Sequence, residues 1–284
     1  MRKCQVVTRE ILLSVRDITV RFGGITALNS VSFDVPRGGV CGLIGPNGAG
    51  KTTLFNCLSR LYRYESGDIL FEGNSISNLP VHRIASYGIG RTFQNLAMFR
   101  TLSVRQNIMI GAHCRSRSGF LSSALRLRRV AQEEARLMAR ANELLALLGL
   151  GDVAERPVSD LPFGIQKRVE FARALAADPK LILLDEPAAG LNHEELADLT
   201  ETIRLVQSKL GITILLVEHH MGLVMGISDH IVVLNFGAKI AEGTPAQIQS
   251  NPDVIAAYLG APAAAGTPVQ PAQPVQPFHA GAPA

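Results

Sequence analysis

The segment GPNGAGKT, residues 45–52, constrains the fold of this 284-residue chain more than any other feature. It fits the pattern GxxxxGK[ST], and it stands between an apolar run, VCGLI, and a segment with helical spacing, KTTLFNCLSRL. When a strand turns through glycines into a helix, backbone N–H groups converge where the helix dipole also favours negative charge. The segment therefore predicts an α/β fold whose sheet presents a phosphate-binding loop.

Each residue type in this loop has a task in binding a nucleotide. The glycines let backbone amides turn inward, Lys51 can reach the terminal phosphates, and the Thr52 hydroxyl can be a ligand of Mg²⁺. The predicted nucleotide contacts are Gly45, Pro46, Asn47, Gly48, Ala49, Gly50, Lys51, Thr52 and Thr53. The alternative interpretation is a glycine-rich turn beside an exposed lysine.

Two adjacent carboxylates, Asp185 and Glu186, follow the apolar run LILL. That position is the carboxyl end of a predicted strand, where α/β sheets collect their ligands. Hydrolysis of a phosphate bond requires one carboxylate to hold the metal and another to accept a proton from water, and we assign these tasks to Asp185 and Glu186 respectively. Taken alone, an acidic pair at a strand end is also typical of a helix cap.

The rest of the chain alternates between strand and helix patterns. Apolar and polar residues alternate at 31–35, and short predicted strands and helices follow the loop. From about 100 to 177 the strand signals vanish, and segments such as AQEEARLMARANELLALLGL have helical periodicity. Buried-strand runs return in LILLDEP, GITILLVEH and HIVVLNFG. We therefore predict a mostly parallel sheet, covered on both faces, with an inserted helical lobe.

The C-terminal part changes character near Gly260. Thr244-Pro245 and Asn251-Pro252 each place a capping residue before a proline, which predicts two short helices. The last 24 residues contain six Pro and eight Ala but no Lys, Arg, Asp or Glu. Because this composition offers little large apolar surface to offset ordering entropy, residues 261–284 are predicted to be a disordered tail.

Composition narrows the possible classes of protein. A hydrophobic content of 47% suffices for a large core, whereas 5% aromatic residues and no Trp leave little to stack on single-stranded nucleic acid. A net charge of +4 is too small for a protein that coats DNA. The four cysteines have neither CxxC nor metal-ligand spacing. No run approaches the roughly 18 apolar residues of a membrane span, so we expect a cytosolic chain whose membrane contact is peripheral.

Basic residues are concentrated in one segment. Seven arginines lie between 115 and 140, against Glu133 and Glu134. One interpretation of this concentration of arginines is a solvated helix face. The alternatives are a surface that contacts anionic lipid or a permease, or one that binds nucleic acid weakly.

Several further strings resemble one family. RTFQ, LPFGIQKRVEFARAL, LLDEP, AAGLN and LLVEHH follow the loop in the order found in ATP-binding cassette ATPases, and the resemblance covers about residues 10–260. Within that family, RTFQNLAMF, LLDEPAAGLN and NPDVIAAYLG resemble the ATPase subunits of bacterial branched-chain amino acid importers. The resemblance implies a P-loop NTPase (RecA-like) core, an N-terminal antiparallel β-subdomain and an α-helical subdomain inserted at about 95–177.

The resemblance also implies roles for three residues outside the loop. Phe22 would stack on adenine, Gln94 would sense Mg²⁺ and the membrane partner, and His219 would contact the γ-phosphate and hold the catalytic geometry. Alternatively, Phe22 is a core residue, Gln94 is solvated and His219 is a structural hydrogen-bond partner. Because neighbouring side chains on a strand point to opposite faces, Glu218 is not expected to share the role of His219. His220 stands where relatives often carry an acid.

The segment LPFGIQKRVEFARAL occupies the place of the LSGGQ signature and departs from it. Pro162, Phe163 and Ile165 replace Ser, Gly and Gln, so Gly164 and the following helix amides would carry more of the anion binding. The resemblance implies that this signature acts on ATP held by a second cassette subunit, in a head-to-tail pair. We expect a heterodimer, with a homodimer possible. Asn192 replaces the Asp commonly found in the AAGLN segment.

The resulting expectation is an ATPase subunit on the cytoplasmic side of the inner membrane. It would hydrolyse Mg-ATP to drive permease subunits that import branched-chain or related hydrophobic amino acids, supplied indirectly by a periplasmic binding protein. Glu186, His219 and Lys51 are the expected catalytic residues, and Thr52, Gln94 and Asp185 are expected around Mg²⁺. The alternatives are the ATPase of a lipopolysaccharide-type exporter and, less favoured, a cassette ATPase acting on nucleic acid; no specific nucleic acid is expected as a partner.

Overall fold

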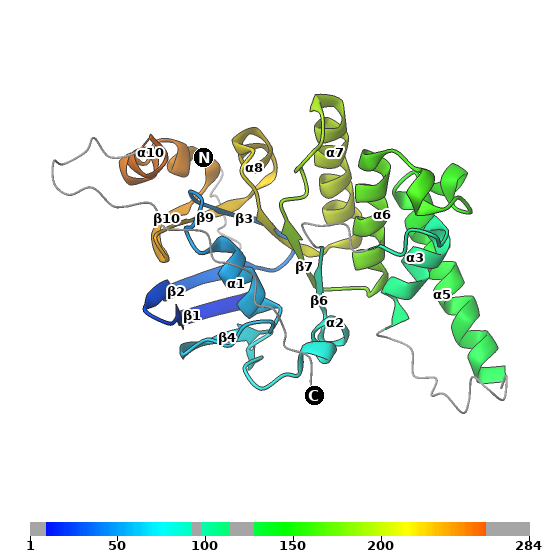
Figure 1. Cartoon of the computed structure of the whole chain (residues 1–284), viewed down its shortest axis with the longest axis horizontal. Coiled ribbons are helices and arrows are strands. Elements are labelled where there is room, and N and C mark those ends of the chain that lie inside the picture. The colour runs from blue at the N-terminus through cyan, green and yellow to red at the C-terminus, as the bar shows by residue number, and fades with distance from the viewer. Residues whose placement is uncertain (1–9, 93–97, 114–127, 260–284) are drawn as a thin grey trace, which may run out of the picture.

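The computed structural model of the chain describes residues 10–92, 98–113 and 128–259, and its centre is a six-stranded sheet (Figure 1). The strand order is β10-β9-β3-β8-β7-β6. All neighbours pair in parallel except β10, which is antiparallel to β9 at one edge. The strands are β3 (Val40–Ile44), β6 (Ile89–Arg91), β7 (Leu181–Asp185), β8 (Thr213–Val217), β9 (His230–Asn235) and β10 (Ala238–Gly243). The prediction of a mostly parallel sheet is confirmed.

Successive residues of the central strands pack into two different cores. Leu43 and Leu215 belong to a core that contains helix α1 (Lys51–Leu58) and the second sheet of the protein. Ile44 and Leu216 belong to the core on the other face, which contains the later helices. Because both faces are covered, these strands are apolar along their whole length instead of alternating.

The second sheet is antiparallel and has the order β2-β1-β4-β5. Its strands are β1 (Ile11–Phe22), β2 (Ile25–Pro36), β4 (Ser66–Phe71) and β5 (Asn74–Ser75). Val31, Phe33 and Val35 are buried, as their alternation with polar residues predicts. The predicted N-terminal antiparallel subdomain is therefore confirmed.

Between β6 and β7 the named elements that the structure describes are all helical. They are α3 (Val104–Gly111), α5 (Arg128–Leu147), two short 3₁₀ helices (Gly151–Val153 and Val158–Asp160) and α6 (Phe163–Ala176). Helices α3, α5 and α6 pack against one another on the right of Figure 1. The helix predicted to begin near Gly164 begins one residue earlier, at Phe163. The arginine-rich segment lies partly outside the described residues.

The remaining helices cover the sheet and close the described part of the chain. They are α2 (Ile84–Tyr87, after a 3₁₀ turn at Val81–Arg83), α7 (His193–Leu210), α8 (Met221–Ile227), α9 (Pro245–Gln249) and α10 (Pro252–Leu259). The Thr244 side chain accepts the backbone N–H of Gln247, and the Asn251 side chain accepts those of Asp253 and Val254. Both predicted C-terminal helices and their caps are confirmed.

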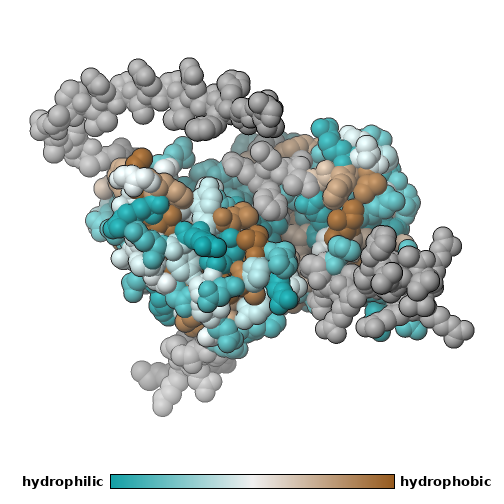
Figure 2. Space-filling model, turned by 60° about the horizontal axis from the view of Figure 1, so that its bottom comes forward, coloured by the Kyte–Doolittle hydropathy of each residue, from teal (hydrophilic) through white to brown (hydrophobic). Residues whose placement is uncertain are grey.

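Within the described residues, no helix combines the length and the apolar character needed to cross a bilayer. Among the described residues on the face shown in Figure 2, hydrophilic side chains are common, and hydrophobic ones form separate patches. The predicted tail, residues 261–284, lies outside the described residues.

Candidate active site

Three glycines give the loop between β3 and α1 its shape. Gly45, Gly48 and Gly50 all have positive φ, at 153°, 79° and 99°. A Cβ atom at Gly45 would lie 2.1 Å from the carbonyl oxygen of Leu234, and one at Gly50 would lie 2.7 Å from that of Ala27. Gly48 faces open space. The first and last glycines therefore let the loop pack closely on its neighbours, while Gly48 leaves room outside it.

Lys51, the first residue of α1, is buried inside this loop. Its Nζ donates to the carbonyl oxygens of Gly45 at 2.7 Å and Pro46 at 2.9 Å. Burial lowers the pKa of Lys51, and the negative charge of Glu186 opposes that shift. The cation thus lies among the backbone groups that would surround a phosphate. Thr52, the next residue, is exposed at the start of the helix.

Asp185 ends β7 and is 5% exposed. Its Oδ2 lies 2.8 Å from Nη2 of Arg91, and its backbone N–H donates to Oγ1 of Thr92 at 3.4 Å. Arg91 also donates to the side chains of Asn56 in α1 and of Ser59, the C-cap of that helix. One buried guanidinium therefore links Asp185 to that helix.

Arg91 was not assigned a role from the sequence. The signal that could have found it is its place at the carboxyl end of the short strand IGR, next to the strand that ends in Asp185. Charged side chains at that edge of neighbouring parallel strands lie close together.

Glu186 and His219 are brought together at the same edge of the sheet. Oε1 of Glu186 lies 2.5 Å from Nε2 of His219. Glu186 has φ of 47°, a left-handed conformation that is strained for a side chain of this kind, and its backbone N–H donates to the carbonyl of Val217. Strained residues held by their surroundings cluster at active sites. Glu186, the predicted base, is therefore in direct contact with His219, the residue predicted to contact the γ-phosphate.

Glu218 and His219 both lie beyond the end of β8, so the alternation of faces along a strand does not apply to them, and their contacts nevertheless differ. Glu218 is 3% exposed, and its carboxylate accepts the backbone N–H groups of Ala188, His219 and His220 at 2.7, 2.9 and 3.2 Å. Glu218 therefore fixes the loop after β7 to the loop after β8. His220 caps α8, since its Nδ1 accepts the N–H of Leu223.

A cavity of about 430 Å³ adjoins Glu186 and His219. Residues from the AAGLN segment, the start of α7 and the end of β8 line it: Glu186, Ala188, Ala189, Leu191, Asn192, His193, Leu196, Glu218, His219 and His220. Asn192 is the N-cap of α7, where its side chain accepts the N–H of Glu195 at 2.9 Å. The Asn at this position thus performs the capping that an Asp would perform.

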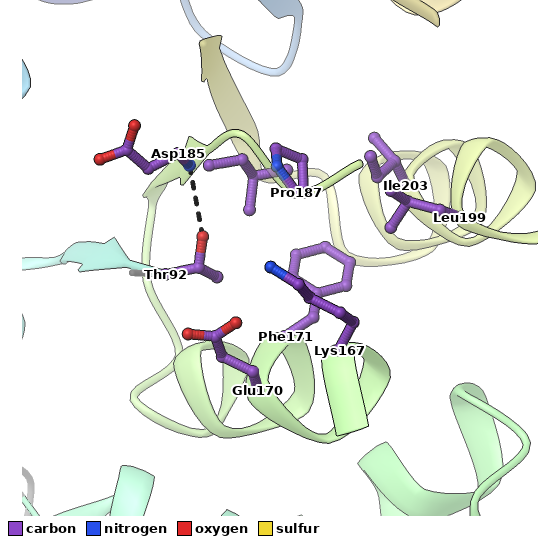
Figure 3. A pocket seen from close by; sticks show the side chains of 9 residues that line it. Thr92, Lys167, Glu170, Phe171, Asp185, Pro187, Leu199 and Ile203 are labelled. Carbon is purple, nitrogen blue, oxygen red and sulfur yellow. Dashed lines mark hydrogen bonds between the residues drawn. The ribbon is translucent and has the colours of Figure 1, made fainter. Parts of the chain in front are cut away.

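The start of α6 lies on the other face of the sheet from α1. Residues of α6 pack in one core and residues of α1 in the other, and Figure 1 shows the two helices on opposite sides of β7. Gly164 is in the first turn of α6, close to Glu195. A second, very small pocket lies between α6, β7 and α7, with Lys167 and Asp185 among its lining residues (Figure 3). The chain therefore does not bring Gly164 to its own phosphate loop.

Two further predicted residues have separate outcomes. Phe22 is 48% exposed at the end of β1, where its ring meets Tyr62 edge to face at 5.3 Å between centroids. It is not a core residue. Gln94 lies outside the described residues.

Family models and curated relatives place this chain in the same family. Residues 28–189 match the family model described as ABC transporter, and residues 238–264 match that of the branched-chain amino acid ATP-binding cassette transporter. The chain is 44% identical over 249 residues to the high-affinity branched-chain amino acid transport ATP-binding protein BraF of Pseudomonas aeruginosa, covering 88% of this chain and 98% of BraF. LivG of Escherichia coli K12, with the same description, has the same identity and coverage.

A solved structure is similar over nearly its whole length. The crystal structure of the ADP conformation of an ATP-binding cassette of an ABC transporter superposes with a TM-score of 0.77 and 33% identity, covering 88% of this chain and 99% of that one. The fold, the order of the motifs and these matches agree with the resemblance seen in the sequence. The chain belongs to the ATP-binding cassette transporter family.

Proposed function

We propose that this protein is the ATP-hydrolysing subunit of an importer of branched-chain or related hydrophobic amino acids. The proposal depends on one observation. Three features lie at the same edge of the sheet, namely the loop that surrounds Lys51, the buried Asp185 and the Glu186–His219 pair. The cargo is supported by the similarity to BraF and LivG, since an ATPase subunit does not itself report its cargo.

In this proposal the loop binds the phosphates of ATP, and Phe22 stacks on the base. The oxygen donors for Mg²⁺ would be the Thr52 hydroxyl, the Asp185 carboxylate and the Gln94 amide, a set of the kind that Mg²⁺ prefers. Thr52 is exposed at the start of α1, and Asp185, whose Oδ2 pairs with Arg91, ends a strand at the same edge, so the Thr52 hydroxyl and the other Asp185 oxygen would hold the ion. When bound, Mg²⁺ would neutralise phosphate charge.

Hydrolysis is assigned to three side chains. The Glu186 carboxylate accepts the proton of the attacking water. His219, whose Nε2 lies 2.5 Å from that carboxylate, orients it, and the imidazole contacts the γ-phosphate. Lys51 balances the charge of the terminal phosphates. Its carbonyl partners at Gly45 and Pro46 hold the ammonium in place for that contact.

A second subunit completes the site. Because α6 and α1 pack on opposite faces of the sheet, the α6 N-terminus with Gly164 is available to ATP held by another cassette subunit. We propose a head-to-tail pair, a heterodimer in preference to a homodimer, attached to permease subunits on the cytoplasmic side of the inner membrane. A periplasmic binding protein would deliver the cargo. The division into a nucleotide-binding unit (10–260), its helical insert (about 95–177) and a tail (261–284) belongs to the same proposal.

The experiment is transport by the complex copurified from membranes and placed in vesicles, with wild type compared with Glu186→Gln. We expect ATP-driven uptake of leucine, isoleucine or valine by the wild type. The Glu186→Gln variant should retain ATP binding, and its rate of ATP hydrolysis should fall by about 100-fold or more. Near-normal turnover of the variant would remove Glu186 from its role. Copurification with exporter permeases and no uptake would contradict an importer.

A further inference from the structure

Phe163, which replaces a signature glycine, lies against the AAGLN segment of its own chain. A Cβ atom at Gly190 would be 3.0 Å from Cε1 of the Phe163 ring, so the ring packs on the bare backbone of Gly190. Gly190 has φ of 82°, a conformation that favours glycine. The ring is 42% exposed, so this contact covers one part of it and solvent reaches the rest.

Lys167, one turn further along α6, supplies a second contact to the same ring. Its Nζ lies 5.6 Å from the ring centroid, within the range of a cation–π interaction. The Lys167 side chain is itself buried, and it lines the small pocket that also contains Asp185 and Pro187. Figure 3 shows Lys167 extending from α6 into this space. Phe163 is therefore held between its own helix and the segment that follows β7.

Gly164, the next residue of α6, also lies close to the segment at the start of α7. A Cβ atom at Gly164 would lie 2.6 Å from Oε1 of Glu195. Glu195 belongs to the capping box of α7, where its Oε2 accepts the N–H of Asn192 at 3.0 Å. Two consecutive residues at the start of α6 thus contact two points around the start of α7.

We propose that Phe163 is a positioning residue that locks the beginning of α6 to the AAGLN segment. The two segments then approach the nucleotide of the partner subunit as one unit, which compensates for the loss of the signature Ser and Gly. The inference rests on the proposed head-to-tail pair. It assigns Phe163 to the closure of the pair, and it leaves the reacting atoms to Glu186, His219 and Lys51.

The test compares ATP hydrolysis by the copurified complex carrying Phe163→Gly, Phe163→Tyr or Gly190→Ala. Losing the ring contacts should raise the KM for ATP about threefold to tenfold and leave kcat within about twofold, as expected for aromatic and cation–π contacts of this kind. Phe163→Tyr keeps the ring and should restore the wild-type KM. Tyr87→Leu, which removes another partly exposed aromatic ring that lies against Phe71 of β4 and not against Phe163 or Gly190, should leave KM unchanged.

A double-mutant cycle separates a direct contact from a general effect on folding. Gly190→Ala introduces a methyl group against the ring and also places a side chain at a φ that favours glycine. The part of its effect on KM that comes from the ring should therefore disappear when Phe163 is already Gly, and the double variant should be less than additive. An unchanged KM in Phe163→Gly, additive effects in the double variant, or a change in thermal stability alone would overturn the positioning role. Absence of ATP hydrolysis by the wild-type complex would instead overturn the proposed function.

Discussion

Arg91 and Asp185 form an ion pair from which solvent is largely excluded, with side chains only 10% and 6% exposed. Removing one partner of a buried pair leaves the other charge uncompensated, at a cost of about 3–5 kcal/mol. We therefore expect Arg91→Met to lower the free energy of unfolding by about 3 kcal/mol or more, measured by urea denaturation.

The matched control is Arg16→Met, which breaks an exposed pair. Arg16 and Asp34 are 47% and 37% exposed, and pairs of this kind contribute about 0–1 kcal/mol. Equal losses of stability in the two variants would contradict the buried role of Arg91.

At the scale of single residues, the sequence identified those that end apolar runs. The position of Asp185, Glu186 and His219 at one sheet edge could be predicted because Asp185 ends a buried strand and the other two come shortly after one, and Lys51 could be predicted because its loop has a recognisable pattern. The partners of these residues could not be predicted in the same way. Arg91 lies 94 positions from Asp185, and Glu218 lies 30 positions from Ala188. Such pairs are created by strand order, which local patterns do not encode.

At the scale of elements, the capping box of α7 provides a direct test. Asn192 accepts the N–H of Glu195, and Glu195 accepts the N–H of Asn192. Asn192→Ala should lower the free energy of unfolding by about 1 kcal/mol, whereas Asn192→Asp should leave it nearly unchanged, because both Asn and Asp are good N-caps. Thermal or urea unfolding measures both variants. A loss with Asp as large as with Ala would show that capping is not the role of Asn192.

Elements with strong local signals were predictable, and weakly marked ones were not. The helices after Thr244 and Asn251 follow from proline and capping residues, and α6 was predicted within one residue of its start. β10 was not singled out, because its residues are only partly buried and form no apolar run. The strand order, in which β3 lies between β9 and β8, also depends on contacts far apart in the chain.

At the scale of the whole molecule, Glu72 joins the two sheets. It lies after β4 of the antiparallel sheet and pairs with Arg37 at 2.8 Å and with Lys180, just before β7 of the parallel sheet, at 2.6 Å. The hydrogen bond from Lys180, followed by that from Arg37, lowers the pKa of Glu72 below its usual value of 4.5. The ionised Glu72 carboxylate therefore stabilises the folded protein at pH values above the pKa that Glu72 has in the unfolded chain.

Acid should remove the contribution of Glu72 as the pH falls through its lowered pKa. We expect wild type to lose more stability between about pH 6 and about pH 3 than Glu72→Gln does, because the variant has no proton to bind at this position. Urea midpoints at both pH values provide the measurement. Identical losses in the two proteins would show that Glu72 does not link the sheets through its charge.

The proposed function depends on the loop at 45–52 binding the phosphates of ATP together with Mg²⁺, which calorimetric titration with ATP measures. Wild type should bind ATP more tightly with Mg²⁺ than with a chelator. In Lys51→Ala the Kd for ATP should rise about tenfold or more, because a hydrogen bond to a charged group contributes about 1.5–3 kcal/mol. Binding that is independent of Mg²⁺ and unchanged in Lys51→Ala, or no binding by wild type, would show that this loop does not hold Mg-ATP.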